Sequence, residues 1–243
     1  MTNYFPAFTK FDRPEYSFYQ PVWQHNGRVI DKIENEKGRF YYVDGLPLPS
    51  VTTVLGKTKT EYDKNVIKEW QERVGLEEAE KIKNDASVRG DFTHKICEDF
   101  ILNKPIPELT GNNFHLFRQV YPIISKRITN IHLLESTLFS KKLKIAGRVD
   151  CVAEFDGKLS VIDFKTARAE REDYMIGGYF VQETIYGIMF SEMYKLPIKQ
   201  IVTIMAIDNS PFRKEAQVFV KSPLTYLEQA VTKVRQYYKE LEK

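Results

Sequence analysis

The stretch from Gly147 to Lys165 constrains the fold more than any other part of this sequence. It reads Gly-Arg-Val-Asp-Cys-Val-Ala-Glu-Phe-Asp-Gly-Lys-Leu-Ser-Val-Ile-Asp-Phe-Lys, so two apolar-rich runs flank the pair Asp156-Gly157. An Asp-Gly pair between two such runs is a strong signal for a tight turn between antiparallel strands. The sequence therefore predicts a β-hairpin over these residues.

Three charged side chains occupy this hairpin where apolar ones would normally pack: Asp150, Asp163 and Lys165. Asp163 and Lys165 are two positions apart on one strand, so they project from the same face, and Asp150 lies on the preceding strand. Burying such a cluster is unfavourable unless something compensates the charges. A divalent cation is the natural compensator, and hard oxygen ligands suit Mg²⁺ or Mn²⁺.

The same residues resemble a known nuclease signature. Asp150 followed by Asp163-Phe164-Lys165 is similar to the Asp…(Asp/Glu)-x-Lys pattern of the PD-(D/E)XK nuclease superfamily, and Gly147 to Asp150 resembles the Gly-x-x-Asp form of its first motif. The resemblance implies that Asp150, Asp163 and Lys165 are catalytic. It also implies that Asp150, Asp163 and the carbonyl of Phe164 bind the metal. An Asp-x-Lys triplet alone is a weak signal, and the hairpin context strengthens it.

A helix is predicted over residues 172–195, where apolar residues recur at helical spacing: Ile176, Phe180, Ile185 and Met189. Gln182 and Tyr186 are four positions apart and share one face of this helix. They resemble the Gln-x-x-x-Tyr motif of RecB-type nucleases, which implies a catalytic and DNA-binding role through hydrogen bonds to DNA or to the catalytic lysine. A core-facing Tyr186 with an incidental Gln182 is the competing interpretation.

Further ligands are suggested upstream of the hairpin. Arg89-Gly90-Asp91-Phe92-Thr93-His94 resembles the Arg-Gly-x-x-x-His element of RecB-type nucleases, which implies that His94 binds the metal and that Arg89 contacts DNA. A lone helical histidine is otherwise a packed or solvated residue. Glu135 matches an acidic position that many of these nucleases carry one strand before Gly-x-x-Asp. It is a further candidate ligand, and a strand-edge carboxylate is the alternative.

The segment from Phe40 to Leu55 is similar to the N-terminal part of the mitochondrial genome maintenance exonuclease family and its phage relatives. In it, Ser50 can cap the helix that follows. Ser50 and Thr52 are candidate DNA contacts, as are Lys142 and Arg148 on the strand that enters the hairpin. A solvated charged face explains the basic residues equally well.

These patterns predict an α/β fold of the restriction-endonuclease-like kind, with a mixed central sheet flanked by helices and an N-terminal helical region arching over the active site. We expect one nuclease domain over residues 1–243. Its parts are an N-terminal arm and strands (1–60), a helical region (61–130), a catalytic core (131–220) and a C-terminal helix (221–243). The helical pattern from about 61 to 103 is expected to break near Gly75, and Trp70 is expected to anchor it to the core.

Composition excludes some classes of protein. A chain of 243 residues with 42% hydrophobic residues can bury one sizeable core, and no apolar run approaches a membrane span. Its two cysteines are too few for the four-cysteine iron–sulfur cluster that some RecB-type nucleases carry, so we expect none. The N-terminus shows neither a signal-peptide core nor a transit pattern, which favours the cytoplasm of a bacterial or phage-infected cell. A net charge of +3 permits a local basic channel without demonstrating one.

The resemblance implies a metal-dependent DNA exonuclease that hydrolyses phosphodiester bonds from free ends of single-stranded DNA, in replication, recombination or repair. Its partner would be DNA, with a single-strand-binding or recombination protein as a candidate second partner; the oligomeric state stays open. Three alternatives remain: an exonuclease that resects double-stranded ends, a structure-specific endonuclease of the same fold, and a non-catalytic DNA-binding subunit. The intact Asp163-x-Lys165 argues against the last, because a scaffold gains nothing from that charge cluster.

Overall fold

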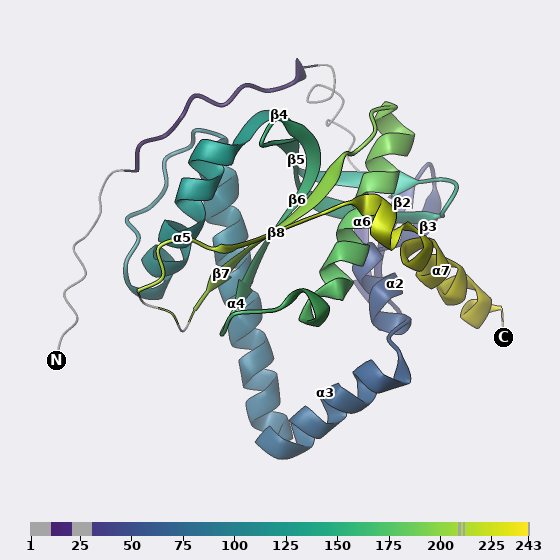
Figure 1. Ribbon diagram of the computed structural model, residues 1–243. Helices are drawn as coiled ribbons and strands as arrows, with labels where there is room; N and C mark the ends of the chain where they lie inside the picture. Colours follow the sequence, from purple (N-terminus) through teal and green to yellow (C-terminus); the bar gives the residue numbers. More distant parts are fainter. Residues whose placement is uncertain (1–10, 21–30, 209, 211, 243) are drawn as a thin grey trace.

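The structure is a computed structural model that describes residues 11–20, 31–208, 210 and 212–242 (Figure 1). It contains a small sheet of three strands near the N-terminus and a main sheet of five strands. The strands of the main sheet, in their spatial order, are β4 (Ile128–Ser140), β5 (Ile145–Phe155), β6 (Lys158–Ala167), β7 (Gln200–Ile207) and β8 (Gln217–Lys221).

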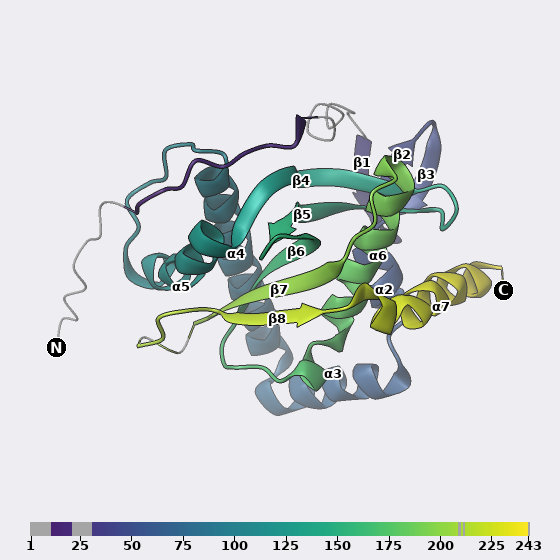
Figure 2. The same cartoon turned by 45° about the horizontal axis from the view of Figure 1, so that its top comes forward.

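The main sheet is mixed. β4, β5 and β6 follow one another as antiparallel neighbours, β7 lies parallel to β6, and β8 is antiparallel to β7. Parallel neighbours cannot be joined by a tight turn, so the chain crosses from β6 to β7 through α6 (Gly177–Tyr194), which packs on the sheet (Figure 2). This arrangement confirms the α/β fold with a mixed central sheet that the sequence predicts.

Helices cover both faces of the main sheet (Figure 2). α6, α7 (Pro223–Leu241) and α2 (Val51–Lys57) enclose one apolar cluster, and α4 (Leu76–Ile101) and α5 (Gly111–Arg127) enclose the other. Successive side chains of β6 point alternately into the two clusters. Val161 packs in the first cluster, whereas Ile162 and Phe164 pack in the second. Asp163 therefore shares the α6 side of the sheet with Val161.

The small sheet leads directly into α2. Its strands β1 (Asp31–Asn35), β2 (Gly38–Val43) and β3 (Leu46–Pro49) are antiparallel neighbours. Ser50 follows β3 as the N-cap of α2, and its Oγ accepts a hydrogen bond from the Thr53 N–H at 2.9 Å. The helix cap predicted at Ser50 is therefore confirmed.

α3 (Glu61–Val74) differs from the other helices because none of its side chains is buried. It begins with a capping box, in which the Thr60 side chain and the Asp63 side chain each bond the other's backbone N–H, and it ends at Gly75, where the φ of 87° turns the chain into α4. α3 joins α2 to α4 away from the sheet (Figure 1). The break near Gly75 is confirmed, but Trp70 as a core anchor is wrong, because the helix has no core beside it.

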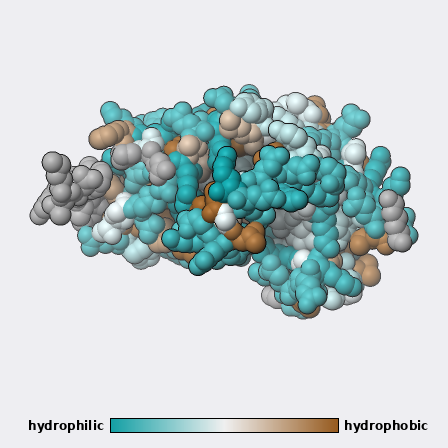
Figure 3. Space-filling model, turned by 90° about the horizontal axis from the view of Figure 1, so that it is seen from below, coloured by the Kyte–Doolittle hydropathy of each residue, from teal (hydrophilic) through white to brown (hydrophobic). Residues whose placement is uncertain are grey.

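We call α3 and the first half of α4, residues 61–90, the helical projection. Ala79 is its one buried side chain, and several large apolar side chains on it are exposed, among them Tyr62, Leu76 and Val88. Seen from the side on which α3 lies, the surface is mainly hydrophilic with small apolar groups between (Figure 3). The projection is thus an amphipathic segment with little packing against the body.

The described part of the N-terminal arm, residues 11–20, packs along the body. The Ile131 N–H of β4 donates to the Ser17 carbonyl at 2.8 Å, and the Tyr19 N–H donates to the Ile131 carbonyl at 2.7 Å. Tyr16 is buried in the cluster under α4 and α5. Over these residues the N-terminal arm expected from the sequence packs on the body, whereas residues 1–10 and 21–30 lie outside the described part. Among the described residues, no helix combines the length and apolar character needed to cross a membrane.

Candidate active site

The β5–β6 hairpin places the charged residues at the point where its two strands separate. Asp156 and Gly157 form the turn with φ of 50° and 72°, the positive values that tight hairpin turns require. The last paired residues are Cys151 and Ile162, and Asp150 lies just beyond them. There the Asp150 Oδ2 accepts a hydrogen bond from the Phe164 backbone N–H at 2.9 Å. The Asp150 carboxylate thus accepts a backbone N–H of β6 that is not used in the pairing between β5 and β6.

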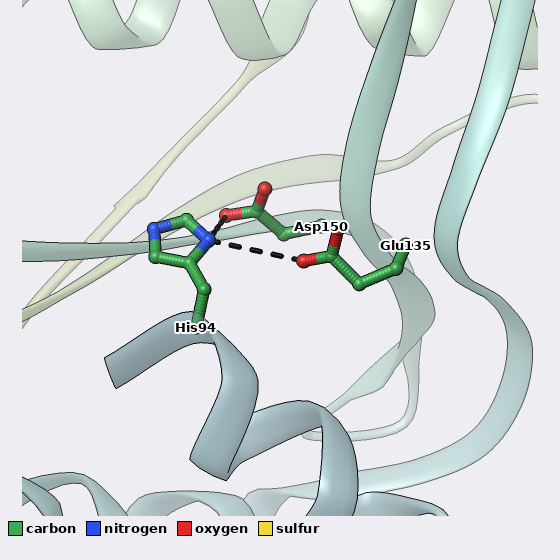
Figure 4. Close-up of side chains that lie close together, drawn as sticks. All are labelled: His94, Glu135 and Asp150. Carbon is green, nitrogen blue, oxygen red and sulfur yellow. Dashed lines mark ion pairs between the residues drawn. The ribbon is translucent and has the colours of Figure 1, made fainter. Parts of the chain in front are cut away.

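Three side chains from separate elements converge at this point: His94 of α4, Glu135 of β4 and Asp150 of β5 (Figure 4). The His94 Nδ1 lies 3.3 Å from the Asp150 Oδ2 and 3.8 Å from the Glu135 Oε1. Their candidate ligand atoms all lie within 4.8 Å of one another. One imidazole nitrogen with two carboxylates is a donor set that fits a divalent cation such as Mn²⁺ or Mg²⁺.

In the absence of a cation, the pKa values of His94 and Asp150 are shifted by their interaction with each other. Burial alone would lower the pKa of His94, but the neighbouring carboxylates of Asp150 and Glu135 raise it to about 10. Burial alone would raise the pKa of Asp150, but His94, Lys165 and the Phe164 N–H hold it at about 2. His94 therefore carries a proton in the metal-free protein, and a bound cation would take the place of that proton.

Glu135 is held in an unusual backbone conformation. Its φ is 47°, a left-handed value that residues other than glycine seldom adopt, and such strain is concentrated at functional sites. The Arg148 Nε lies 2.7 Å from the Glu135 Oε2 and donates to the Glu135 carbonyl at 3.0 Å. Arg148, a predicted DNA contact, therefore clamps Glu135 and directs its carboxylate toward His94.

Asp163 and Lys165 form an ion pair on β6. Asp163 is 2% exposed. Its burial raises its pKa to about 6, although Lys165 opposes the shift. Burial alone would lower the pKa of Lys165, yet Asp163 and Asp150 raise it above its ordinary value. The Lys165 Nζ also lies 5.1 Å from the centre of the Tyr179 ring, in a cation–π contact. Lys165 is therefore a fixed cation in this state.

The predicted ligands are thus divided between two groups. His94, Glu135 and Asp150 form what we call the ligand cluster, and Asp163 pairs with Lys165 beside it. The charges of Asp163 and Lys165 act on Asp150 and His94, so the two groups belong to one site. Phe164 contributes its backbone N–H to Asp150, and a role for its carbonyl stays a prediction.

Gln182 and Tyr186 support the hairpin from α6. Tyr186 is buried, which raises its pKa, and a hydrogen bond with Gln182 opposes that shift. The Tyr186 ring packs on Gly147, where an added Cβ would lie 2.9 Å from the Tyr186 Cε1 and 3.0 Å from the Val51 Cγ2. The glycine of Gly-x-x-Asp and the tyrosine of Gln-x-x-x-Tyr are therefore in contact.

Comparisons with known proteins agree with this geometry. A family model described as the PD-(D/E)XK nuclease superfamily matches residues 115–243. The chain belongs to this superfamily.

Curated relatives carry more specific names. The mitochondrial genome maintenance exonuclease 1 of Mus musculus is 33% identical over 128 residues, which are 49% of this chain and 37% of that protein. The Homo sapiens protein of the same name is 31% identical over the same shares of the two chains. The match thus spans little more than a third of these relatives. A crystal structure of a Eubacterium rectale protein named as an exonuclease aligns over 64% of this chain and 65% of its own, at 10% identity and a TM-score of 0.44.

Several residues predicted to bind DNA are otherwise engaged in this PD-(D/E)XK chain. The Arg89 Nη1 lies 3.1 Å from the Asp208 Oδ2, which ties α4 to the end of β7. Ser50 is buried and used as a helix cap. Thr52 is exposed on α2, and Lys142 is exposed in the β4–β5 turn before β5 begins, whereas Asp150 lies in the middle of β5. For all four, DNA binding stays a prediction.

Three residues that lie beside the site were not predicted from the sequence: Tyr179, Glu183 and Thr203. Tyr179 contacts Lys165, and Glu183 is buried on α6 with its Oε1 accepting a hydrogen bond from the Thr203 hydroxyl. One signal was available, because Glu183 is a lone charged residue in the apolar core of α6 and directly follows Gln182. Tyr179 and Thr203 carry no comparable signal, since each is ordinary in its helix or strand.

Proposed function

We propose that this chain is a divalent-metal-dependent deoxyribonuclease that hydrolyses phosphodiester bonds from free ends of single-stranded DNA. The observation that carries the proposal is the ligand cluster, contributed by α4, β4 and β5, beside the Asp163–Lys165 pair of β6. The first group can hold a cation, and the second supplies a fixed positive charge next to it. Phosphodiester hydrolysis needs both, because charge builds up on the phosphate in the transition state.

A Mg²⁺ or Mn²⁺ ion bound there would supply an acidified water and offset charge on the phosphate. His94, Glu135 and Asp150 would hold it, and Asp163 is the fourth candidate ligand. Lys165 would bind a phosphate oxygen, since its raised pKa keeps it a cation rather than a base. The Phe164 N–H fixes the direction of Asp150, and Arg148 fixes that of Glu135.

The preference for single strands is supported by the exposed aromatic rings that flank the hairpin in the sequence. Tyr62 of the helical projection is 76% exposed, and Tyr174, which lies between β6 and α6, is 80% exposed. Unpaired bases stack on such rings without sequence preference, whereas paired bases are not free to do so. The exonuclease names of the curated relatives support action from ends. We place the activity in DNA replication, recombination or repair, in the cytoplasm of a bacterial or phage-infected cell.

The test compares end-labelled linear single-stranded DNA, a closed single-stranded circle and a blunt duplex, each with Mg²⁺ or Mn²⁺. Loss of the linear strand alone supports the proposal. Cutting of the circle would mean an endonuclease, and loss of the duplex alone would mean an enzyme that resects double-stranded ends. Cutting of none by a folded protein would mean a DNA-binding subunit.

Two variants make the assay specific to this site. Lys165→Ala should abolish cleavage, because it removes the fixed cation. Lys158→Ala is the matched control, since Lys158 begins the same strand and is exposed. Equal activity of the two variants would show that any cleavage comes from elsewhere.

A further inference from the structure

Glu183 is a buried carboxyl group with half of its hydrogen-bonding capacity unused. It lies on α6, its side chain is fully buried, and its Oε1 accepts a hydrogen bond from the Thr203 hydroxyl. Its Oε2 is buried too, and within the described residues it has no hydrogen-bond partner. Such a group is unfavourable in a core and calls for a reason, because most buried polar atoms in native proteins are paired.

The position of Thr203 supplies the reason. Thr203 on β7 is in register with Asp163 on β6, and paired residues of parallel neighbouring strands project from the same face. That face is the one on which α6 packs. The Glu183–Thr203 bond therefore joins the helix to the sheet directly beside Asp163, on the side of Asp163 away from β5.

The charge state of Glu183 follows from its surroundings. Burial raises its pKa well above the ordinary value, and the nearby Asp163 raises it further, while the bond from Thr203 and the charge of Lys165 oppose this only in part. The raised pKa favours the protonated carboxyl group, which can donate a hydrogen bond as well as accept one. A neutral acid behind Asp163 adds no repulsion to a site that already holds several carboxylates.

We propose that Glu183 is a positioning residue for Asp163: its side chain, held by Thr203 between α6 and the sheet, fixes the direction of the Asp163 carboxylate. The inference rests on the proposed function, in which Asp163 faces the cation and Lys165. Glu183 itself touches neither DNA nor metal, because it is fully enclosed between α6 and the sheet.

A purely structural role predicts something different. A core position filled only for packing would be served better by an apolar side chain of similar shape, because that side chain leaves no polar atom unpaired. Replacing Glu183 by Met should then leave stability equal or higher and leave the site unaffected. A positioning role predicts equal or higher stability together with a damaged site, a combination that marks residues kept for function.

The experiment uses the full chain with Glu183→Met, Glu183→Gln and Thr203→Val. Thr184→Val is the matched control, because Thr184 is a buried threonine of the same helix whose hydroxyl donates only to the Phe180 carbonyl. Four quantities are measured: the rate of end-label release at saturating DNA and Mn²⁺, the KM for DNA, the Mn²⁺ affinity by calorimetry, and the thermal midpoint without metal.

Glu183→Met should keep or raise the thermal midpoint and leave the KM for DNA within about twofold. It should lower the maximal rate by about tenfold or more and weaken Mn²⁺ binding, because small displacements of a catalytic group are costly. Thr203→Val should fall between it and the wild type. Glu183→Gln, a neutral side chain of the same shape, should stay within about threefold of the wild type in all respects. Thr184→Val should behave as the wild type.

Two results would overturn the inference. Wild-type rate and Mn²⁺ affinity in Glu183→Met would show that Glu183 only fills space. A loss in Glu183→Gln as large as in Glu183→Met would show that the carboxylate acts as an anion. If the wild type cleaves no substrate, the proposed function fails, while the Mn²⁺ affinities of the same variants still decide whether Glu183 positions Asp163.

Discussion

The Oδ2 of Asp150 accepts a hydrogen bond from the backbone N–H of Phe164 at 2.9 Å. This contact joins a candidate metal ligand on β5 to the backbone of the strand that carries Asp163 and Lys165. The direction of the Asp150 carboxylate is therefore set by a main-chain atom, independently of the side chain at position 164. The bond therefore couples the two strands of the hairpin at the site.

Asp150→Asn should preserve the fold and weaken metal binding. The amide oxygen can still accept the Phe164 N–H, but the substitution removes a negative charge from the ligand cluster. We expect the Mn²⁺ affinity, measured by calorimetry, to fall by about tenfold or more. Glu154→Gln, on the same strand but outside the cluster, is the control and should bind Mn²⁺ normally. Unchanged affinity in Asp150→Asn would remove Asp150 from the metal site.

The stability of the metal-free protein should depend on pH through the His94–Asp150 pair. The pKa of His94 rises from 6.5 to about 10 on folding, so its contribution is complete below pH 6.5 and is lost as the pH rises toward 10. The pKa of Asp150 falls from 3.8 to about 2, so its contribution is complete above pH 3.8 and is lost as the pH falls toward 2. The pair therefore contributes its full stabilisation between pH 3.8 and pH 6.5.

Thermal melts in a chelator between pH 6.5 and 9.5 check this expectation. The midpoint of the wild type should fall across that range by more than that of His94→Gln, which has no proton to lose there. Parallel curves for the two proteins would contradict the raised pKa of His94.

Lys165→Met should cost stability as well as activity. It leaves Asp163 buried without its partner, and removing one member of a buried ion pair costs about 3–5 kcal/mol. The loss should be smaller at pH 5 than at pH 8, because the pKa of Asp163 is already about 6 and a protonated Asp163 needs no partner. Denaturant unfolding at the two pH values measures it. The double variant Asp163→Asn with Lys165→Met should recover most of the stability and none of the cleavage. If the double variant stayed as unstable as Lys165→Met, the loss of stability would come from the missing aliphatic part of the lysine side chain and not from the broken ion pair.

Gly147→Ala should disturb the site through Tyr186. The new Cβ would lie 2.9 Å from the Tyr186 Cε1, so the ring or β5 must shift, at a cost of about 1–3 kcal/mol. A lower thermal midpoint and slower cleavage are expected together. Gly178→Ala is the control, because nothing lies within 4 Å of an added Cβ there and its stability should be equal or slightly higher. Equal thermal midpoints of the two variants would show that the contact between Gly147 and Tyr186 does not contribute to stability.

Much of the fold could be predicted because local signals agree with it. The Asp156-Gly157 turn, the alternation along β6 and the Ser50 cap each follow from rules that involve only neighbouring residues. Trp70 shows where such rules fail. Its helix has an apolar stripe like that of a packed helix, but whether a core lies beside the stripe depends on the path of the whole chain.

The site divides in the same way. Residue types and spacing in the hairpin are enough to nominate Asp150 and Lys165, whereas His94 is nominated by the resemblance of residues 89–94 to an element of RecB-type nucleases. The positive φ of Glu135, its clamp by Arg148 and the ion pair of Arg89 with Asp208 depend on contacts between distant segments, which spacing does not encode. In the fold Arg148 and Arg89 each hold a neighbouring carboxylate, and DNA contacts of these two residues stay predictions.

The absence of buried side chains in α3 has a consequence for how the molecule moves. A helix stabilised only by its capping box and by exposed contacts opens locally at low free energy, whereas β6, enclosed on both faces, exchanges its amide hydrogens only when the whole domain unfolds. The projection can therefore melt and re-form many times while the hairpin keeps its geometry. The projection and the active-site hairpin therefore fluctuate on different timescales.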